Sequence, residues 1–149
     1  MAAYSFQDVN ASISGVGGNF LLGSGAGAAD EGITIAAVAD KNTMTMGADG
    51  SSMHSMNPST ASTVTVRLLK TSPINAFLMS MFNTQSTSSA LWGSNVITVT
   101  ILQTGEVINL TSCAFKKAPN LEYAREAKSV EWNFDCGRTS STLGIYNGF

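Results

Sequence analysis

Strict alternation of apolar and polar residues in two stretches constrains this chain most strongly. In the first, Val64, Val66 and Leu68 alternate with threonine and arginine. The second stretch is residues 129–136. There, valine, tryptophan, phenylalanine and cysteine alternate with acidic and amide side chains. A period of two places one set of side chains on a buried face and the other set in water. Both stretches are therefore predicted to be half-buried β-strands.

A single convincing helix pattern follows the first of these strands, at about residues 72–83. Ser72 suits the N-cap, and Pro73 suits the first helical position because its φ is fixed and it lacks an N–H. Apolar residues then recur at helical spacing: Ile74, Phe77, Leu78, Met81 and Phe82. The helix should end between Asn83 and Ser89, where Ser, Thr and Asn side chains compete for backbone hydrogen bonds.

Further β-rich runs complete the expected core. Residues 96–102 and 106–115 flank Gln103-Thr104-Gly105, which predicts a hairpin. Strand patterns also occur at residues 4–14 and at residues 33–39. Strand, helix and hairpin form the predicted centre of the fold.

A polar stretch at residues 49–62 follows an alternating run that contains Met44 and Met46. It is either a long loop or the tip of a long hairpin with stems at 43–47 and 62–69. Met53 and Met56 within it are either an exposed contact surface, which flexible methionine side chains suit, or fold back on the core.

Two other segments lack a clear period. Residues 19–32 are rich in Gly and Ala and are predicted to be a flexible loop. Their closely spaced glycines are followed by no Gly-Lys-Ser/Thr and no helix pattern, which argues against a phosphate-binding loop. Residues 121–128 are predicted to be a loop or an edge strand, because their apolar spacing fits neither period.

Length and composition indicate one folded domain over residues 1–149, with a polar tail at 138–149 that a neighbouring molecule would order. Charged residues make up only 12% of the chain, whereas 44% are hydrophobic. The surface must therefore rely on Ser, Thr, Asn and Gly, and we expect its uncharged faces to meet other proteins. The predicted fold class is mainly β, a sandwich or barrel with one short helix and long loops or hairpin tips.

Charge differs in sign between the two halves of the sequence. Residues 1–66 carry five acidic residues against Lys41, a charge of -4, and residues 67–149 carry five acidic and seven basic residues, a charge of +2. Complementary patches on one subunit suit head-to-tail contacts between identical copies. Mixing of the two halves in space, without functional meaning, is an equally good explanation. No run of Lys and Arg marks a surface that binds nucleic acid.

Groups for catalysis are scarce. His54, the one histidine, lies in a Ser- and Met-rich stretch and is expected to be an exposed loop residue. Asp30 and Glu31 are adjacent in a Gly-rich loop and are expected to be solvated charges. Cys113 and Cys136 fall on opposite or adjacent strand patterns, which leaves open whether they are neighbours, and buried thiols are expected more than a disulfide. We therefore predict no catalytic, cofactor-binding or metal-binding residues, and no enzyme activity.

Several segments together resemble the tail tube proteins of contractile-tailed bacteriophages. They are AYSFQDVNASISG near the start, the stretch from Asp49-Gly50 through Met53-His54-Ser55 and Asn57-Pro58-Ser59, TVTVRLLKTSPINAFL, and SVEWNFDCG. The resemblance spans nearly the whole chain. It implies a β-sandwich or barrel with a flanking helix, and hexameric rings that stack into the inner tube through which phage DNA leaves.

The resemblance also implies partners and a location. They are copies of the chain itself, the tail sheath protein, and baseplate and tail terminator proteins, with DNA passing through the lumen without specific binding. The expected location is the virion tail, after assembly in the host bacterial cytoplasm and without contact with a membrane. On the same grounds, residues 19–32, 48–61 and 138–149 are expected to make contacts between rings. The alternatives are a secretion-tube or baseplate protein of the same fold, or a small hydrolase.

Overall fold

The computed structural model describes residues 3–5, 8–22, 28–101 and 103–146. Its elements are β1 (Val9–Gly15), β2 (Gly18–Leu21), β3 (Ala28–Ala37), β4 (Asn42–Met46), β5 (Ser52–Met56), β6 (Ser62–Leu68), α1 (Ile74–Gln85), a short 3-10 turn (Ser89–Leu91), β7 (Asn95–Ile101), β8 (Glu106–Lys117) and β9 (Val130–Thr142). The chain is mainly β with one α-helix in the described part, which confirms the predicted fold class.

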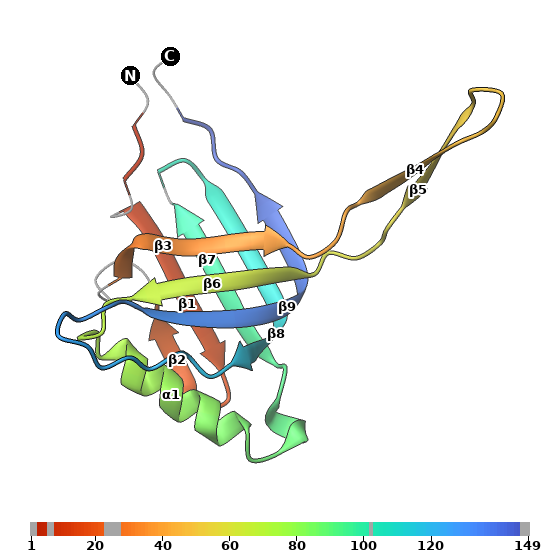
Figure 1. Ribbon diagram of the computed structural model, residues 1–149. Coiled ribbons are helices and arrows are strands. Elements are labelled where there is room, and N and C mark those ends of the chain that lie inside the picture. The colour runs from red at the N-terminus through yellow and green to blue at the C-terminus, as the bar shows by residue number, and fades with distance from the viewer. Residues whose placement is uncertain (1–2, 6–7, 23–27, 102, 147–149) are drawn as a thin grey trace.

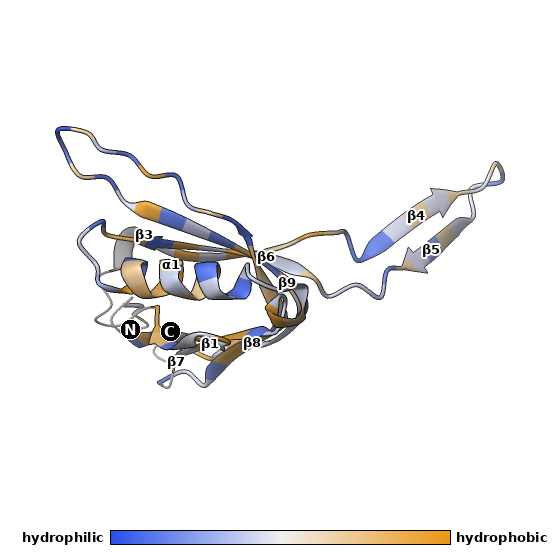
Figure 2. Ribbon diagram, turned by 90° about the horizontal axis from the view of Figure 1, so that it is seen from below, coloured by the Kyte–Doolittle hydropathy of each residue, from blue (hydrophilic) through white to orange (hydrophobic). Residues whose placement is uncertain are grey.

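Seven strands form one antiparallel sheet in the order β2-β1-β7-β8-β9-β6-β3, and β4 and β5 form a separate pair. The large sheet folds over on itself. In Figure 1, β3, β6 and the first part of β9 lie across β1, β7 and β8. Figure 2 shows these two layers from their edge, with α1 beside them. The predicted sandwich is therefore one curved sheet rather than two separate ones.

Strand β9 joins the two layers. Its residues Val130–Cys136 pair with β6, and its residues from Asn133 to Thr142 pair with β8. The change of partner occurs around Gly137, where an added Cβ would lie only 3.2 Å from the Cβ of Ser112. Ser112 itself has a φ of 55°, and the β7–β8 register shifts beside it. Such an irregularity bends a strand and lets it pass from one layer to the other.

Aromatic side chains fill the space between the layers. The rings of Phe115 and Phe134 lie 4.8 Å apart, and those of Phe115 and Trp132 lie 6.0 Å apart. Phe82 of α1 meets Phe115 edge-on at 5.4 Å. Burying side chains of this size contributes roughly 1.5–3 kcal/mol each. One cluster thus links β8, β9 and the helix.

Helix α1 begins at Ile74, with Pro73 at its N-cap, so it starts slightly later than the sequence predicts. The Oγ of Ser72 still accepts a hydrogen bond from the Ile74 N–H at 3.3 Å. The helix ends at Gln85, within the predicted interval. There the Ser86 hydroxyl donates to the Phe82 carbonyl at 2.7 Å, which is the competition expected from this run of hydroxyl residues.

A buried amide pair fixes the end of the helix to the sheet. The Gln85 Nε2 donates to Asn95 Oδ1 at 2.7 Å and to the Val16 carbonyl at 2.8 Å. The Asn95 Nδ2 donates back to Gln85 Oε1 at 3.0 Å. Both side chains are fully buried. Because a buried amide without partners costs free energy, this pair specifies one position of α1 against β7.

Three sequence predictions need correction. Residues 19–32 are not one flexible loop: Asn19, Phe20 and Leu21 belong to β2, and β3 begins at Ala28, while residues 23–27 lie outside the described residues. The hairpin that contains residues 49–56 has β4 and β5 as its stems, not 43–47 and 62–69. The segment expected to form the tail from residue 138 belongs to β9 as far as Thr142. In each case backbone pairing with a partner strand orders a segment that was expected to be a loop, a hairpin tip or a tail.

The other predicted strands are found. The alternations at 9–13, 62–68 and 130–136 bury the expected side chains, and the hairpin around residues 103–105 joins β7 to β8. Residues 121–128, left open between loop and edge strand, are a loop. In the described part of the chain, no helix has both the length and the apolar character needed to cross a membrane.

We predict that Gly15→Ala destabilises the fold by about 1–3 kcal/mol, as overpacking of a closed interior does. A methyl group at Gly15 would overlap the Asn95 side chain and approach Gln85, and so would push the buried amide pair apart. The measurement is the free energy of unfolding in urea. Ser14→Ala, an exposed change in the same strand, is the control and should shift this free energy by less than about 0.5 kcal/mol. Equal effects of the two variants would contradict the prediction.

Candidate assembly interfaces

The hairpin of β4 and β5 projects from the sandwich, as Figures 1 and 2 both show. Every residue from 36 to 60 is exposed. The exposed fractions of its four methionine side chains are 57% for Met44, 56% for Met46, 60% for Met53 and 77% for Met56. An isolated two-stranded hairpin is marginally stable in water. An extended hairpin with large apolar side chains in solvent is therefore a candidate contact surface.

The methionines of this hairpin are unevenly divided between its two faces. Residues opposite each other in an antiparallel pair project to the same face. Met44 is opposite His54, Met46 is opposite Ser52, and Met56 is opposite Asn42. The other face carries Thr43 with Ser55 and Thr45 with Met53. One face, which we call the methionine face, is therefore formed by Met44, Met46 and Met56 with His54 and Asn42.

Local hydrogen bonds hold the hairpin at its tip and at its base. At the tip, Asp49 accepts hydrogen bonds from the Ser51 hydroxyl at 2.6 Å and from the Ser51 N–H at 3.0 Å. These bonds, the hydroxyl first, lower the pKa of Asp49. Gly50 supplies the positive φ of 89° that the turn requires. At the base, the Asn57 N–H donates to the Lys41 carbonyl at 2.8 Å. Hydrogen bonds within the same subunit thus hold the hairpin in its extended form.

His54 lies on this hairpin and is exposed, as predicted, but on strand β5 rather than in a loop. Its Nδ1 is 3.2 Å from the Asn42 Nδ2, so the ring is positioned by a neighbour across the pair. The Asn42 amide therefore orients the imidazole ring on the exposed strand.

The edges of the large sheet are a second candidate interface. Within the described residues, β2 and β3 are its outermost strands. Just after β3, Val38 is 61% exposed, and Leu21 at the end of β2 is 57% exposed. Unpaired strand edges present backbone N–H and C=O groups to any neighbouring strand. Apolar residues beside such edges favour a neighbouring protein over water.

The outer surface of the sandwich is polar with few charges. On β1 and β7, Ser12 pairs with Thr98, and the Thr98 hydroxyl donates to Asn109 Oδ1 at 3.3 Å. On the other layer, the Thr65 hydroxyl donates to Asn133 Oδ1 at 3.0 Å, beside the Arg67–Glu131 ion pair at 3.6 Å. Hydroxyl and amide groups therefore make most of the polar surface that charged side chains form in other proteins.

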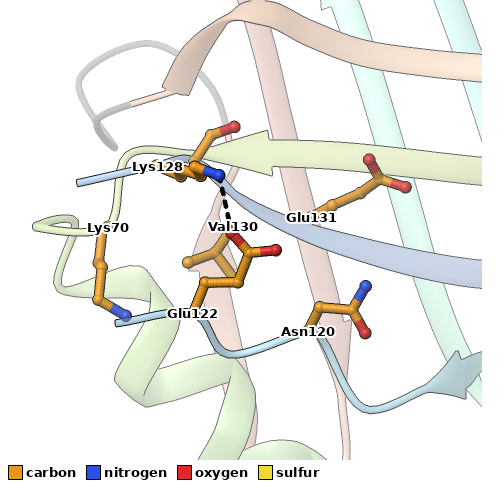
Figure 3. Close-up of a pocket in the computed structure, with 7 residues that line it drawn as sticks. Lys70, Asn120, Glu122, Lys128, Val130 and Glu131 are labelled. Carbon is orange, nitrogen blue, oxygen red and sulfur yellow. Dashed lines mark ion pairs between the residues drawn. The ribbon is translucent and has the colours of Figure 1, made fainter. Parts of the chain in front are cut away.

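A cleft of 260 Å³ lies where the loop before β9 passes the end of β6. Figure 3 shows Lys70, Asn120, Glu122, Lys128 and Glu131 around it, with Lys128 Nζ and Glu122 Oε2 3.3 Å apart. The Lys70 ammonium also lies 4.3 Å above the Tyr123 ring. These contacts join the loop to itself and to the end of β6. Exposed ion pairs of this kind contribute little to stability, and the lining contains no histidine or cysteine.

The other titratable residues that could take part in a reaction do not gather at one site. Cys113 and Cys136 are neighbours, buried and free, in the middle of the sheet. The segment that carries Asp30 and Glu31 belongs to β3, and their side chains lie outside the described part of the structure. The described residues contain no group of three or more His, Cys, Asp or Glu able to hold a metal ion. The arrangement of the described side chains supports contacts between proteins rather than a reaction.

The sequence predicted the first strand of the hairpin, at residues 43–47, but not its partner at Ser52–Met56. The signal was present: Asp49-Gly50 is a turn dipeptide, and it is flanked by residues 43–46 and 52–56, which both alternate methionine with small polar residues. Pairing of these two runs across the turn gives the observed register.

Comparison with known proteins gives the class. The family model of the bacteriophage PhiTE tail tube protein matches residues 1–144. No protein in the curated sequence comparison matches the chain. Among similar solved structures is the cap of the anti-feeding prophage, a tube-terminating cap, with a TM-score of 0.57, 8% identity, and coverage of 97% of this chain and 93% of that chain. Another is a PVC sheath-tube complex of an extracellular contractile injection system in the extended state, with a TM-score of 0.53, 9% identity, and coverage of 91% and 88%.

The fold is thus that of subunits found in contractile injection machines. The chain belongs to the PhiTE tail tube protein family, because the family model covers nearly all of it. It is accordingly a structural protein of a phage tail. The resemblance found in the sequence is confirmed.

We predict that the body of the subunit folds without the hairpin. Replacing residues 42–56 by the turn Asn-Gly should change the free energy of unfolding by less than about 1 kcal/mol, since exposed segments contribute little. Lys41 and Asn57 are already hydrogen-bonded to each other and can be joined by a short turn.

Unfolding in urea, followed by circular dichroism, is the measurement for this variant. Leu110→Ala removes a fully buried side chain and shows the sensitivity of the assay, with an expected loss of about 2–5 kcal/mol. A loss of that size on removing the hairpin would mean that the hairpin supports its own subunit.

Proposed function

We propose that this protein assembles into hexameric rings, and that these rings stack into the inner tube of a contractile phage tail, the conduit for DNA ejection. The observation that carries the proposal is the methionine face, presented to solvent on a hairpin held away from its own subunit. Membership in the tail tube family supports the same conclusion. A monomer would gain nothing from this exposed surface, whereas a stacked assembly can bury it.

In this proposal the hairpin contacts the next ring. A fully buried methionine side chain contributes about 1.5–3 kcal/mol relative to an exposed one. Three such side chains on one face, repeated around a ring, add to a large stacking energy because all copies must bind or dissociate together. The flexible thioether side chains adapt to the small shifts between rings that bending of a tube requires.

Within a ring, the edges of the sheet are the proposed contacts. A neighbouring subunit that places a strand beside β3 or β2 would satisfy the free backbone groups there and remove the risk of uncontrolled aggregation. The charge difference between residues 1–66 and 67–149 is compatible with such head-to-tail contacts. Residues 143–146, which follow β9 and expose Leu143 and Ile145, are a further proposed contact.

The proposed partners outside the tube are the tail sheath, the baseplate and the tail terminator. Support for a sheath comes from the similar structure described as a sheath-tube complex, although it shares only 9% identity. The DNA would pass without specific binding. Acidic residues of the first half of the chain that face the lumen would repel its phosphates. Assembly is proposed to take place in the host bacterial cytoplasm.

A secretion tube is the second candidate, because both similar structures belong to systems named for injection or feeding inhibition rather than for DNA delivery. The two functions differ in what fills the lumen. Retention of small folded proteins inside assembled rings would favour a secretion tube. An empty lumen in particles that deliver DNA would favour the phage tail.

We predict that Met44→Ser, Met46→Ser and Met56→Ser combined abolish tube formation and leave the subunit folded. The three changes remove the apolar part of the methionine face, and none of the three side chains is buried within its own subunit. The measurements are negative-stain electron microscopy and sedimentation over a range of concentrations. The wild-type protein should form rings or hollow tubes.

Met53→Ser is the matched control, since it makes the same chemical change on the opposite face of the hairpin. It should form tubes as the wild-type protein does. Normal tubes from the triple variant would refute the role of the methionine face. A wild-type protein that stays monomeric at high concentration, even with an initiating baseplate complex present, would refute self-assembly altogether.

A further inference from the structure

Two thiols face each other at the point where β9 passes between the layers. Cys113 of β8 is directly opposite Cys136 of β9 in the antiparallel register. Their sulfur atoms are 2.6 Å apart and share a hydrogen bond, and both residues are almost fully buried and free. Opposed residues in an antiparallel pair have Cα atoms about 4.5–5.5 Å apart. That separation lies within the roughly 4.4–6.8 Å that a disulfide spans.

We propose that Cys113 and Cys136 are a reversible oxidation site, which forms an intrachain disulfide when the protein meets a low-molecular-weight disulfide such as oxidised glutathione. The fold brings the two sulfurs together, so little movement is needed to form the bond. The disulfide would lie next to Gly137 and fasten β8 to β9 where the layers join.

The hydrogen bond between the two thiols favours the loss of one proton from the pair. It lowers the pKa of the cysteine that ionises first and raises the pKa of the other, and burial raises both. Because the thiolate is the reactive form, the cysteine that ionises is the first nucleophile and its neighbour is the resolving thiol.

The reaction balances as an ordinary thiol–disulfide exchange. The thiolate of one cysteine attacks one sulfur of oxidised glutathione, forms a mixed disulfide and releases one glutathione thiolate, which takes up the proton that this cysteine lost. The other cysteine loses its proton and attacks the protein sulfur of the mixed disulfide, which releases the second glutathione as a thiol. The protein loses two protons and two electrons, and the oxidant gains them.

The consequence for a tail rests on the proposed function. A subunit made in a reducing cytoplasm would fold and assemble with free thiols. The released particle would meet oxidising surroundings, where the disulfide would form and restrain β8 and β9. The bond closes the loop that contains residues 118–129 and so reduces the freedom of the unfolded chain.

The test uses the full-length protein in glutathione buffers from fully reduced to fully oxidised. Native protein is incubated in each buffer, and urea-unfolded protein is diluted into the same buffers so that access to the buried thiols does not limit the reaction. Samples are quenched with acid and alkylated in denaturant. After reduction they are alkylated again with a heavier reagent, and peptide mass spectrometry locates the protected cysteines.

We expect most chains in the oxidised buffer to carry the Cys113–Cys136 bond, and the melting temperature to rise by about 5–10 °C, as a loop of this length predicts. Reductant should reverse both changes. In concentrated urea the same buffers should give less disulfide, since only the folded chain holds the sulfurs together. Cys136→Ala should show no rise in melting temperature on oxidation, and the wild-type result stands without this variant if it fails to fold.

Free thiols in the oxidised buffer after both routes would overturn the proposal. So would glutathione adducts without the intrachain bond, or an oxidised protein that melts below the reduced one. All of these readouts are made on the subunit, whether or not it assembles. Failure of tube formation and failure of disulfide formation are thus distinguished.

Discussion

The two-sided pairing of β9 is the constraint on which the rest of the structure depends. Residues 133–136 pair with β6 on one side and with β8 on the other, so they belong to both layers at once. The inward side chains of this strand, Trp132 and Phe134, contact Phe115 of β8. Helix α1 then packs on the same cluster through Phe82. If β9 were displaced, the two layers would lose both their shared backbone hydrogen bonds and their common core.

Sequence alone predicted those parts of the fold whose side chains alternate. The strands at 62–68 and 130–136 and the apolar stripe of α1 follow directly from periodicity, because burial of one face is the main source of their stability. The start of β3 was missed because Gly and Ala are frequent in and before it, and β2 was missed because it has only four residues; pairing with β6 and β1 orders them. The continuation of β9 past Gly137 was missed because its side chains are small and polar, and β8 supplies its backbone partners.

The candidate interfaces were predicted less well than the core, for a physical reason. Periodicity in a sequence indicates which side chains pack inside the same chain. A surface for another protein can also carry apolar side chains, but periodicity does not distinguish it from a core. The sequence left Met53 and Met56 open between a contact surface and the core, and the structure shows that they do not pack on the core of their own subunit. Gln85 gives a clearer signal in the sequence. It lies on the buried stripe of the helix that also contains Leu78 and Met81, so its polar side chain requires a buried hydrogen-bond partner. Asn95 is that partner.

Substitutions in the body of the subunit and in the exposed hairpin have different consequences. Inward-facing substitutions in the sandwich change the stability of the subunit, since almost every inward side chain contacts the common core. Side chains between residues 36 and 60 are exposed in their own subunit, so in the proposed tube changes there act on the contact with the neighbouring subunit. The hairpin can therefore diverge together with its receiving surface while the body stays the same. Related tubes that share this body would then remain mutually incompatible, and each would assemble only from its own subunits.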